Sequence, residues 1–318
     1  MLTGRPATVG EQAELHRRAR AGASVMDLSH ELKATSEGAR VIVHGIAPAL
    51  RTYLRSQFDD EVQTAGPRLV FIHIMKVGGT SLCDLFSRWV PSDRAMLHAF
   101  ADDFVLTPTP ILGNLRIIAG HLPYTALSLI PPPFGTMTVL RDPFSRTLSH
   151  YSHMRSAYPA YRGLSLEQFV FDEVYELSGN YQARQLAHQI DLAGAWTTYS
   201  PEQVVISTGG DPMVEHPLAA LFDSGPIGLD DNALLATARA NLDSIDIVGI
   251  TENLDRVAAQ AAAYFGQTFE SIDRLNVSPK VGRDEISDRI RRRIDERTAI
   301  DRELYDQARR RSKDSSGP

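Results

Sequence analysis

The chain has 318 residues, of which 43% are hydrophobic and 23% are charged, a composition typical of a globular protein with one sizeable core. Thirty-three basic residues face 39 acidic ones, and the formal charge of −6 argues against a protein that binds nucleic acid through its overall charge. The single cysteine, Cys83, excludes an intrachain disulfide and disfavours a cysteine-based zinc site.

Residues 1–40 are polar and rich in alanine and glycine, with weak helical periodicity, and the run ARVIVHGI at 39–46 fits a short strand. They predict an N-terminal extension, residues 1–66, that is partly helical or disordered. They hold no apolar core like that of a signal peptide, and no window of about 20 apolar residues occurs in the chain. We therefore expect a soluble, cytoplasmic protein with no membrane partner.

An α/β pattern begins at residue 67. The run LVFIHI, residues 69–74, is mostly apolar, β-branched and aromatic, which predicts a central strand of a parallel sheet. After the turn KVGG, apolar residues at helical spacing predict a helix that Thr80 or Ser81 caps and Pro91 ends. This segment is therefore expected to form a strand, a loop and a helix.

Further elements continue this pattern toward the C-terminus. The runs at 114–122 and 135–143 predict strands that end in polar residues, and Pro143 suits the first turn of a helix. The remaining assignments are helices at about 165–177 and 180–190, an insertion with short elements at 191–236, a strand and helix within 243–266 that Gly266 ends, C-terminal helices at 282–311 and a disordered tail at 312–318. Residues 67–311 are thus expected to form one domain with a three-layer, P-loop-like α/β fold, in which helices flank a central parallel sheet.

The loop after the first predicted strand carries the features of an anion site. Its two glycines make consecutive backbone N–H groups accessible at the start of a helix, where the helix dipole adds positive potential. A lysine supplies a full charge, and two hydroxyl groups supply further donors. The residues predicted to bind the anion are Lys76, Val77, Gly78, Gly79, Thr80 and Ser81. The alternative is a glycine turn that merely joins the strand to the helix.

The lysine of this loop stands before the glycines, whereas the common nucleoside triphosphate loop has it after them. The pattern G-x-x-x-x-G-K-[ST] is absent, and no clear strand ending in a magnesium-binding aspartate follows. The sequence therefore favours a phosphate bound without a metal. No compact group of histidine, aspartate and glutamate ligands predicts a metal site either.

A second segment, LRDPFSRTLSHY at residues 140–151, predicts another phosphate contact. Arg141 lies at the end of a predicted strand, and Ser149 follows eight residues later, about two helical turns on. Both side chains are therefore expected to reach one phosphate near the start of the helix.

The combination of FIHIMKVGGTSL and LRDPFSRTLSHY resembles the sulfotransferases that use 3′-phosphoadenosine 5′-phosphosulfate (PAPS), in particular the branch of heparan sulfate 2-O-sulfotransferases and other carbohydrate sulfotransferases. The resemblance covers roughly residues 68–305 and includes the segments AGHLPY, NYQARQLA, VGITENL, LNVSPK and DRELY. It implies PAPS as co-substrate, with the first loop on the 5′-phosphosulfate and with Arg141 and Ser149 on the 3′-phosphate. It also implies that His121 is the catalytic base and that Lys280 lies near the nucleotide.

The expected chemistry follows from the reaction itself. Sulfuryl transfer is an in-line displacement in which an acceptor hydroxyl attacks sulfur while a phosphate oxygen departs with growing negative charge. His121, at the end of a predicted strand, suits the base that takes the hydroxyl proton. Lys76 is expected to stabilise the departing phosphate. The reaction needs no metal.

The resemblance has two departures in the first loop. Where the family commonly reads Pro-Lys-Thr-Gly-Gly-Thr, this chain has Met75 for the proline and Val77 for the threonine. Val77 has no hydroxyl to donate, so one expected contact to the phosphosulfate is absent while the backbone donors remain.

Alternatives stay open at several positions. His121 taken alone also fits a half-buried histidine bonded to a backbone carbonyl, and His73 fits a structural role. Arg146 fits an ion pair with Asp142 or with a neighbouring helix, and Glu252 fits either a helix cap or a partner that orients Lys76.

The acceptor is predicted to be a hydroxyl of a carbohydrate or a carbohydrate-containing metabolite. The expected acceptor loops at 90–113, 122–134 and 191–236 carry no basic cluster suited to a long polyanion, which favours a small or neutral acceptor. The rival functions are a P-loop-like nucleotide or small-molecule kinase and a non-catalytic nucleotide-binding protein. The sequence makes no prediction of the oligomeric state.

Overall fold

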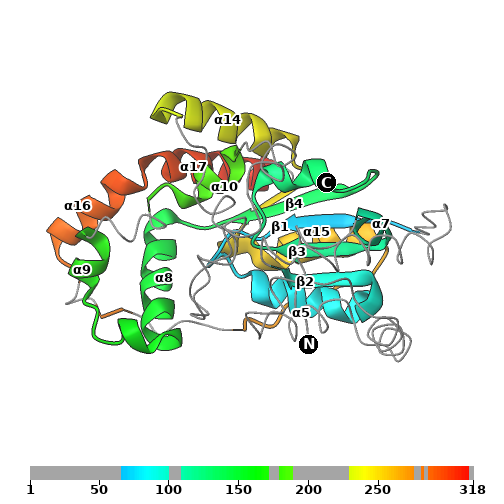
Figure 1. Ribbon diagram of the computed structural model, residues 1–318, viewed down its shortest axis with the longest axis horizontal. Coiled ribbons are helices and arrows are strands. Elements are labelled where there is room, and N and C mark those ends of the chain that lie inside the picture. The colour runs from blue at the N-terminus through cyan, green and yellow to red at the C-terminus, as the bar shows by residue number, and fades with distance from the viewer. Residues whose placement is uncertain are drawn as a thin grey trace, which may run out of the picture.

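The computed structural model describes residues 66–99, 109–171, 179–188, 229–275, 281–282 and 286–314. These residues contain one five-stranded sheet of order β2-β3-β1-β4-β5, and every pair of neighbouring strands is parallel (Figure 1). The strands are β1 (Leu69–Ile72), β2 (Ala95–Ala99), β3 (Ile117–Gly120), β4 (Gly135–Leu140) and β5 (Ile247–Ile250).

The strands form where apolar runs become buried on both faces of the sheet. Every residue of β1, β3, β4 and β5 is buried, as expected for a parallel sheet covered by helices on both sides. In the centre, Leu69 of β1 lies opposite Ile117 of β3 and Gly135 of β4. The strands predicted within 69–74, 114–122, 135–143 and 243–266 are confirmed.

The edge strand β2 was not predicted. Its sequence AMLHA lies within residues 90–113, which were expected to form an acceptor loop. The strand is short, with mixed burial and a register shift between Met96 and Ala99. A half-exposed edge strand carries no continuous apolar run, so periodicity gives little sign of it.

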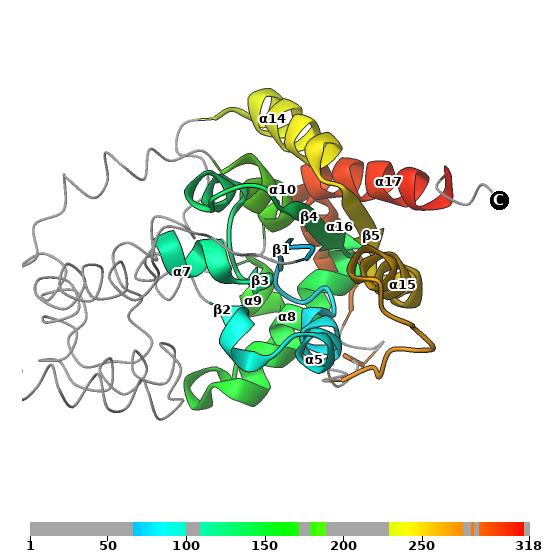
Figure 2. The same ribbon diagram turned by 90° about the vertical axis from the view of Figure 1, so that its right-hand side faces the viewer.

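Helices cover both faces of the sheet, which confirms the three-layer α/β fold. Figure 2 shows two of them, α5 (Gly79–Trp89) and α15 (Leu254–Phe265), on one face. Trp89 and Phe265 bring these two helices together, with their ring centroids 6.1 Å apart. The opposite face carries α10 (Tyr181–Ala187), α14 (Asp231–Ser244) and α17 (Ala299–Asp314) (Figure 2).

A second group of helices extends beyond the sheet and packs around its own small apolar cluster. Tyr151, Phe169 and Ile294 are buried in that cluster, each contributed by a different helix. The helices are α8 (Pro143–Ala157), α9 (Leu166–Phe171) and α16 (Asp288–Arg297), and α7 (Thr109–Asn114) lies before β3. Short 3₁₀ turns occur at Ser92–Arg94, Tyr124–Leu129, Pro159–Tyr161 and Thr251–Asn253.

Several helix boundaries test the sequence predictions. Gly266 ends α15 in a left-handed conformation with φ 66°, and Pro143 opens α8, both as predicted. The C-terminal region forms the helices α16 and α17, and α17 continues to Asp314, so the disordered tail predicted from residue 312 is wrong for residues 312–314. The capping prediction for α5 is wrong, because Gly78 is its N-cap and Thr80 and Ser81 lie inside the helix.

One helix forms where the sequence predicted only an insertion. The helix α14 begins at Asp231, whose preceding residue Asp230 caps it by accepting a hydrogen bond from the N–H of Ala233. Residues 191–228 of the predicted insertion, 1–65 of the predicted extension and 315–318 of the predicted tail lie outside the described residues. In the described ranges, no helix combines the length and apolarity needed to cross a membrane.

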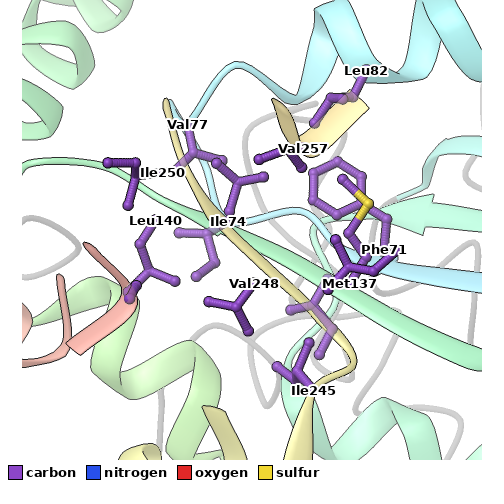
Figure 3. Close-up of a cluster of buried hydrophobic side chains, with 14 of the residues drawn as sticks. Phe71, Ile74, Val77, Leu82, Met137, Leu140, Ile245, Val248, Ile250 and Val257 are labelled. Atoms are coloured by element: carbon purple, nitrogen blue, oxygen red, sulfur yellow. The ribbon is translucent and has the colours of Figure 1, made fainter. Parts of the chain in front are cut away.

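The main core fills the space between β1, β4, β5 and the covering helices. Figure 3 shows Phe71, Met137 and Val248 from these strands among the side chains of this cluster. Val77 and Ile250 belong to the same cluster although they lie near the carboxyl end of the sheet (Figure 3). The apolar core therefore reaches directly beneath the loop that follows β1.

A buried arginine fixes the amino edge of the sheet. Arg68 directly precedes β1 and is only 4% exposed. Its guanidinium donates hydrogen bonds of 2.6 to 3.1 Å to four backbone carbonyl oxygens, those of Leu112, Leu115, Pro131 and Pro133. One side chain thus ties together the segments that enter β3 and β4.

Arg68→Met should destabilise the fold strongly because it leaves four carbonyl groups without their donor. We expect the free energy of unfolding to fall by about 2–4 kcal/mol, measured by chemical denaturation. Arg88→Met is the control, since Arg88 is exposed and its ion pairs among the described residues are with the exposed Asp84 and Asp273, and it should cost far less than Arg68→Met. Equal losses in the two variants would contradict the role given to Arg68.

Candidate functional site

The order of the strands places a crevice at the carboxyl ends of β1 and β4. The chain leaves β1 into α5 on one face of the sheet, whereas it leaves β4 toward α8 and then α10 and α14 on the other. The loops after these two neighbouring strands therefore diverge, which is where open α/β sheets bind ligands. Lys76 follows β1 and Arg141 follows β4, so both predicted phosphate segments meet at this point.

The loop after β1 has the backbone of an anion site. Lys76 and Gly78 adopt left-handed conformations with φ 70° and 92°, and α5 begins directly afterwards. Lys76 is one of only a few non-glycine residues with positive φ in the described ranges, which is a strained conformation for a side chain of this size. No side chain of a described residue caps α5, so its first N–H groups point into the crevice.

Val77 faces away from this crevice. Its side chain is fully buried in the core beside Ile74 and Ile250 (Figure 3). Its carbonyl oxygen accepts a 2.8 Å hydrogen bond from the hydroxyl of Thr251, which also lies 3.3 Å from the carbonyl oxygen of Leu140. A threonine at position 77 would bury its hydroxyl in the core. The side chain here serves packing, and only the backbone of Val77 belongs to the loop.

The two hydroxyl residues of the loop have different surroundings. Thr80 is partly exposed in the first turn of α5. Ser81 is buried, and its Oγ accepts a 2.9 Å hydrogen bond from the backbone N–H of Leu275. Ser81 thus fastens α5 to the segment after α15. The sequence gives no sign of this hydrogen bond, because Leu275 lies 194 positions from Ser81 in the chain.

Arg141 connects the two predicted phosphate segments. Its Nη1 donates a 2.9 Å hydrogen bond to the carbonyl oxygen of Lys76. Burial and the positive charge of Arg141 both lower the pKa of Lys76. Burial also lowers the pKa of Arg141, although the carboxylates of Glu252 and Asp142 partly offset that effect. Two positively charged side chains thus lie in one partly buried region, which favours the binding of an anion between them.

The main chain of Arg141 is held by a glutamine that was not among the predicted site residues. Gln182, fully buried in α10, accepts from the N–H of Arg141 and donates to its carbonyl oxygen, both at 2.9 Å. The only signal in the sequence was its position inside NYQARQLA, a segment that carried the family resemblance.

Ser149 lies on α8, the helix that follows Arg141. It is 7% exposed and stands roughly 10 Å along the helix from the N-cap residue Asp142 at 1.5 Å per residue. Asp142 accepts from the N–H of Ser145 and pairs with Arg302 at 2.5 Å. The predicted nucleotide residue Lys280 lies outside the described residues.

His121 stands at the carboxyl end of β3, on the other side of β1 from Arg141. Its Nδ1 donates a 2.8 Å hydrogen bond to the carbonyl oxygen of His73, so the proton sits on Nδ1 and Nε2 carries the lone pair. Burial lowers the pKa of His121 to about 4, assisted by the charges of His98, Lys76 and His153 and opposed by the bond to His73. The ring is therefore neutral near pH 7 and able to accept a proton.

His73 contacts both His121 and the loop after β1. Its ring lies 4.4 Å from that of His121 and stacks on Phe71 at 5.3 Å between centroids. Its Nε2 also lies close to Gly79, where the Cβ of any larger residue would come within 2.0 Å of that nitrogen. Gly79 is therefore required by the contact with His73 as well as by access to the loop. This agrees with the structural role expected for His73.

Two further residues of α8 take structural positions. His150 is buried edge-on against Phe169, and burial lowers its pKa to about 3. Arg146 is fully buried with its guanidinium 4.9 Å above the ring of Tyr181. Asp142 pairs with Arg302, so the first alternative for Arg146 is wrong, while the charge of Asp301 on the neighbouring helix α17 acts on Arg146.

The sequence fits two roles for Glu252, a helix cap and a partner of Lys76. It hydrogen bonds with the hydroxyl of Tyr305, whose pKa burial and this carboxylate raise to about 12. The carboxylate of Glu252 also acts on Arg141 in the crevice.

Within the part of the chain that the structure describes, no group of three or more His, Cys, Asp or Glu side chains is arranged to hold a metal ion. A scan against models of known protein families found no match, and a search of curated proteins found none either. The geometry of the site therefore carries the functional argument.

Gly79→Ala should displace the loop because the new Cβ would overlap the ring of His73. We expect the free energy of unfolding to fall by about 1–3 kcal/mol, measured by chemical denaturation. Gly163→Ala is the matched control, since a Cβ there meets nothing within 4 Å. In a His73→Ala background the cost of Gly79→Ala should shrink, and an unchanged cost in that double-mutant cycle would contradict the proposed overlap.

Proposed function

We propose that the protein is a PAPS-dependent sulfotransferase that transfers the sulfuryl group to a hydroxyl of a carbohydrate or carbohydrate-containing acceptor. The observation that carries the proposal is the placement of His121, Lys76 and Arg141 at the carboxyl ends of three adjacent strands, β3, β1 and β4. A base, a cation and a phosphate-binding arginine thus stand in a row along one edge of the sheet.

The positive charges of the site support an anionic co-substrate. Lys76 and Arg141 are both partly buried, and the charge of Lys76 adds to the burial that lowers the pKa of His121 and of His73. A phosphosulfate on the N–H groups of the loop and a 3′-phosphate on Arg141 would relieve this repulsion. In this proposal the donors are Lys76 to Ser81 of the loop, together with Arg141, Ser149 and Lys280.

The mechanism follows from the protonation states. Neutral His121 accepts the proton of the acceptor hydroxyl on Nε2 while the hydroxyl oxygen bonds to sulfur. The bond from sulfur to the bridging phosphate oxygen breaks, and Lys76 stabilises the negative charge that develops on the leaving phosphate. Protonated His121 retains the hydrogen bond to the carbonyl oxygen of His73, which supports the imidazolium.

The acceptor and the location are further parts of the proposal. The absence of a basic cluster in the acceptor segments 90–113, 122–134 and 191–236 of the sequence favours a small or neutral acceptor over a long polyanion. We place the protein in the cytoplasm, as the sequence predicts. A P-loop-like kinase is the rival function, and nothing in the loop geometry favours a magnesium triphosphate over a phosphosulfate.

Ligand-induced stabilisation tests the proposal directly. We expect 3′,5′-adenosine bisphosphate to raise the melting temperature, since a ligand at about 100 times its Kd adds about 2.7 kcal/mol, while ATP with magnesium should not. Arg141→Met should abolish the shift, and Arg239→Met, which removes only an exposed pair with Glu303, should preserve it. Stabilisation by ATP with magnesium alone would contradict the proposal and favour the kinase.

His121→Ala should lower the rate of sulfuryl transfer from PAPS by about 10²–10⁴-fold, the usual contribution of a general base. Binding of the bisphosphate should be retained, because His121 lies across β1 from Arg141. Transfer is measured with labelled PAPS over a panel of sugars, and binding by calorimetry. Near-normal transfer by the variant would refute the assignment of the base.

The pH profile of transfer tests the state of the same histidine. Because burial lowers the pKa of His121 to about 4, kcat/KM should stay level from pH 7 to about 5 and fall only near pH 4, whereas an ordinary histidine titrates near 6.5. The acid limb of kcat should lie at a higher pH than the acid limb of kcat/KM, since bound phosphosulfate offsets the positive charge of Lys76.

Stability must be followed alongside the pH profile. In the unfolded chain His121 regains its ordinary pKa, so the unfolded state binds more protons between about pH 4 and 6.5 and stability falls as the pH drops through that range. Rates are therefore compared only where circular dichroism shows the native fold. An acid limb of kcat/KM centred near pH 6.5 would contradict the neutral, buried state assigned to His121.

A further inference from the structure

A buried chain of hydrogen bonds leads from α17 through α10 to Arg141. At its outer end, the carboxylate of Asp301 accepts from the N–H groups of Gln182 and Ala183 at 3.2 and 2.8 Å, in the first turn of α10. In return, Oδ1 of Asn180 accepts from the N–H groups of Ile300 and Asp301 in the first turn of α17. The two helix starts thus cap one another.

The inner end of the chain fixes the backbone of Arg141. The side-chain amide of Gln182 forms a pair of 2.9 Å hydrogen bonds with the N–H and carbonyl groups of Arg141, as a neighbouring strand would do. The guanidinium of Arg141 in turn donates a hydrogen bond to the carbonyl oxygen of Lys76. Asp301 and Gln182 are both fully buried.

The charges along this chain are balanced within the fold. Burial raises the pKa of Asp301, while the positive charge of Arg146 and the two N–H donors act in the opposite direction. Buried polar groups of this kind are costly unless every hydrogen bond is made. Asp301 and Gln182 satisfy backbone groups of α10 and of Arg141 that an apolar residue would leave buried without partners, so the junction stabilises the fold and also fixes the backbone of Arg141.

We propose that Gln182, held by Asp301, is the positioning residue that sets the place of Arg141 relative to Lys76, and thereby makes the site selective for a nucleotide with a second phosphate at the 3′ position. This inference rests on the proposed function. In this inference, α10 and α17 fix the separation between the two phosphate-binding segments. The local sequences of β1 and β4 do not determine that separation.

The reason for selectivity is geometric. A nucleotide with only a 5′-phosphate contacts the loop at 76–81, which the core holds through Val77 and the hydroxyl of Thr251. A 3′-phosphate additionally requires the guanidinium of Arg141 at a defined place. Loss of the Gln182 amide frees the backbone of Arg141, so the affinity gained from the 3′-phosphate should fall more than the affinity for the 5′-phosphate.

The test is the ratio of two dissociation constants, for 5′-AMP and for 3′,5′-adenosine bisphosphate, measured by calorimetry on the full chain. The wild-type protein should prefer the bisphosphate, and Gln182→Met, of similar shape but without the amide, should reduce that preference by about fivefold or more. Asn241→Leu is the matched control. It removes a 2.7 Å hydrogen bond from Asn241 to the carbonyl oxygen of Leu186 at the other end of α10 and should leave the ratio unchanged.

A second variant keeps the test decisive if Gln182→Met does not fold. Asp301→Asn retains the shape of the side chain but replaces one acceptor with a donor that faces an N–H group, so it disturbs Gln182 without touching Arg141. It should lower the bisphosphate preference by a smaller factor. A folded Gln182→Met or Asp301→Asn protein with the wild-type ratio would overturn the inference. A wild-type protein without any bisphosphate preference would instead overturn the proposed function, and the inference with it.

Discussion

The hydrogen bond from Arg141 to the carbonyl oxygen of Lys76 is the contact on which the site depends. It joins the ends of β1 and β4, the two neighbouring strands whose connections leave on opposite faces of the sheet. It also holds the backbone of Lys76, whose positive φ is costly for a lysine. A residue kept in that conformation directs the N–H groups that follow it toward the crevice. The energy of the strain is thus offset by a contact from the other phosphate segment.

This arrangement places cations together before any ligand binds. Burial and, to a smaller extent, the charge of Arg141 lower the pKa of Lys76. The charge of Lys76 in turn contributes to the lowered pKa values of four histidines, His73, His121, His150 and His153. Burial is the larger cause of these low pKa values, and the charge of Lys76 adds to it. The positive charge that favours an anion therefore also helps to keep His121 unprotonated, as the proposed role of base requires.

Much of the fold could be predicted from the sequence, because fully buried parallel strands leave continuous apolar runs. The strands β1, β3 and β4 and the capping of α15 by Gly266 are read directly from such local signals. The edge strand β2 and the start of α14 could not be read in that way, since one has mixed burial and the other follows a region rich in proline and glycine.

The candidate site shows the same division between local and tertiary information. The loop residues and Arg141 were recognisable because glycines and strand ends carry their own pattern. The roles of Gln182 and Asp301 were hidden, because their partners lie 41 and 119 positions away in the chain. Val77 was likewise unexplained from sequence, since only the packed core reveals that position 77 points away from the crevice (Figure 3).

The order of the strands also gives the proposed reaction its direction. An in-line displacement needs the attacking hydroxyl and the departing oxygen on opposite sides of sulfur. In the sheet, β1 lies between β3 and β4, so Lys76 stands between His121 on one side and Arg141 on the other. A nucleotide whose 3′-phosphate sits on Arg141 would extend over β4, leaving the space above β3 and β2 for the acceptor. In the proposed reaction, His121 would therefore lie one strand from the phosphosulfate loop and two strands from Arg141, and the axis of transfer would run across the strands.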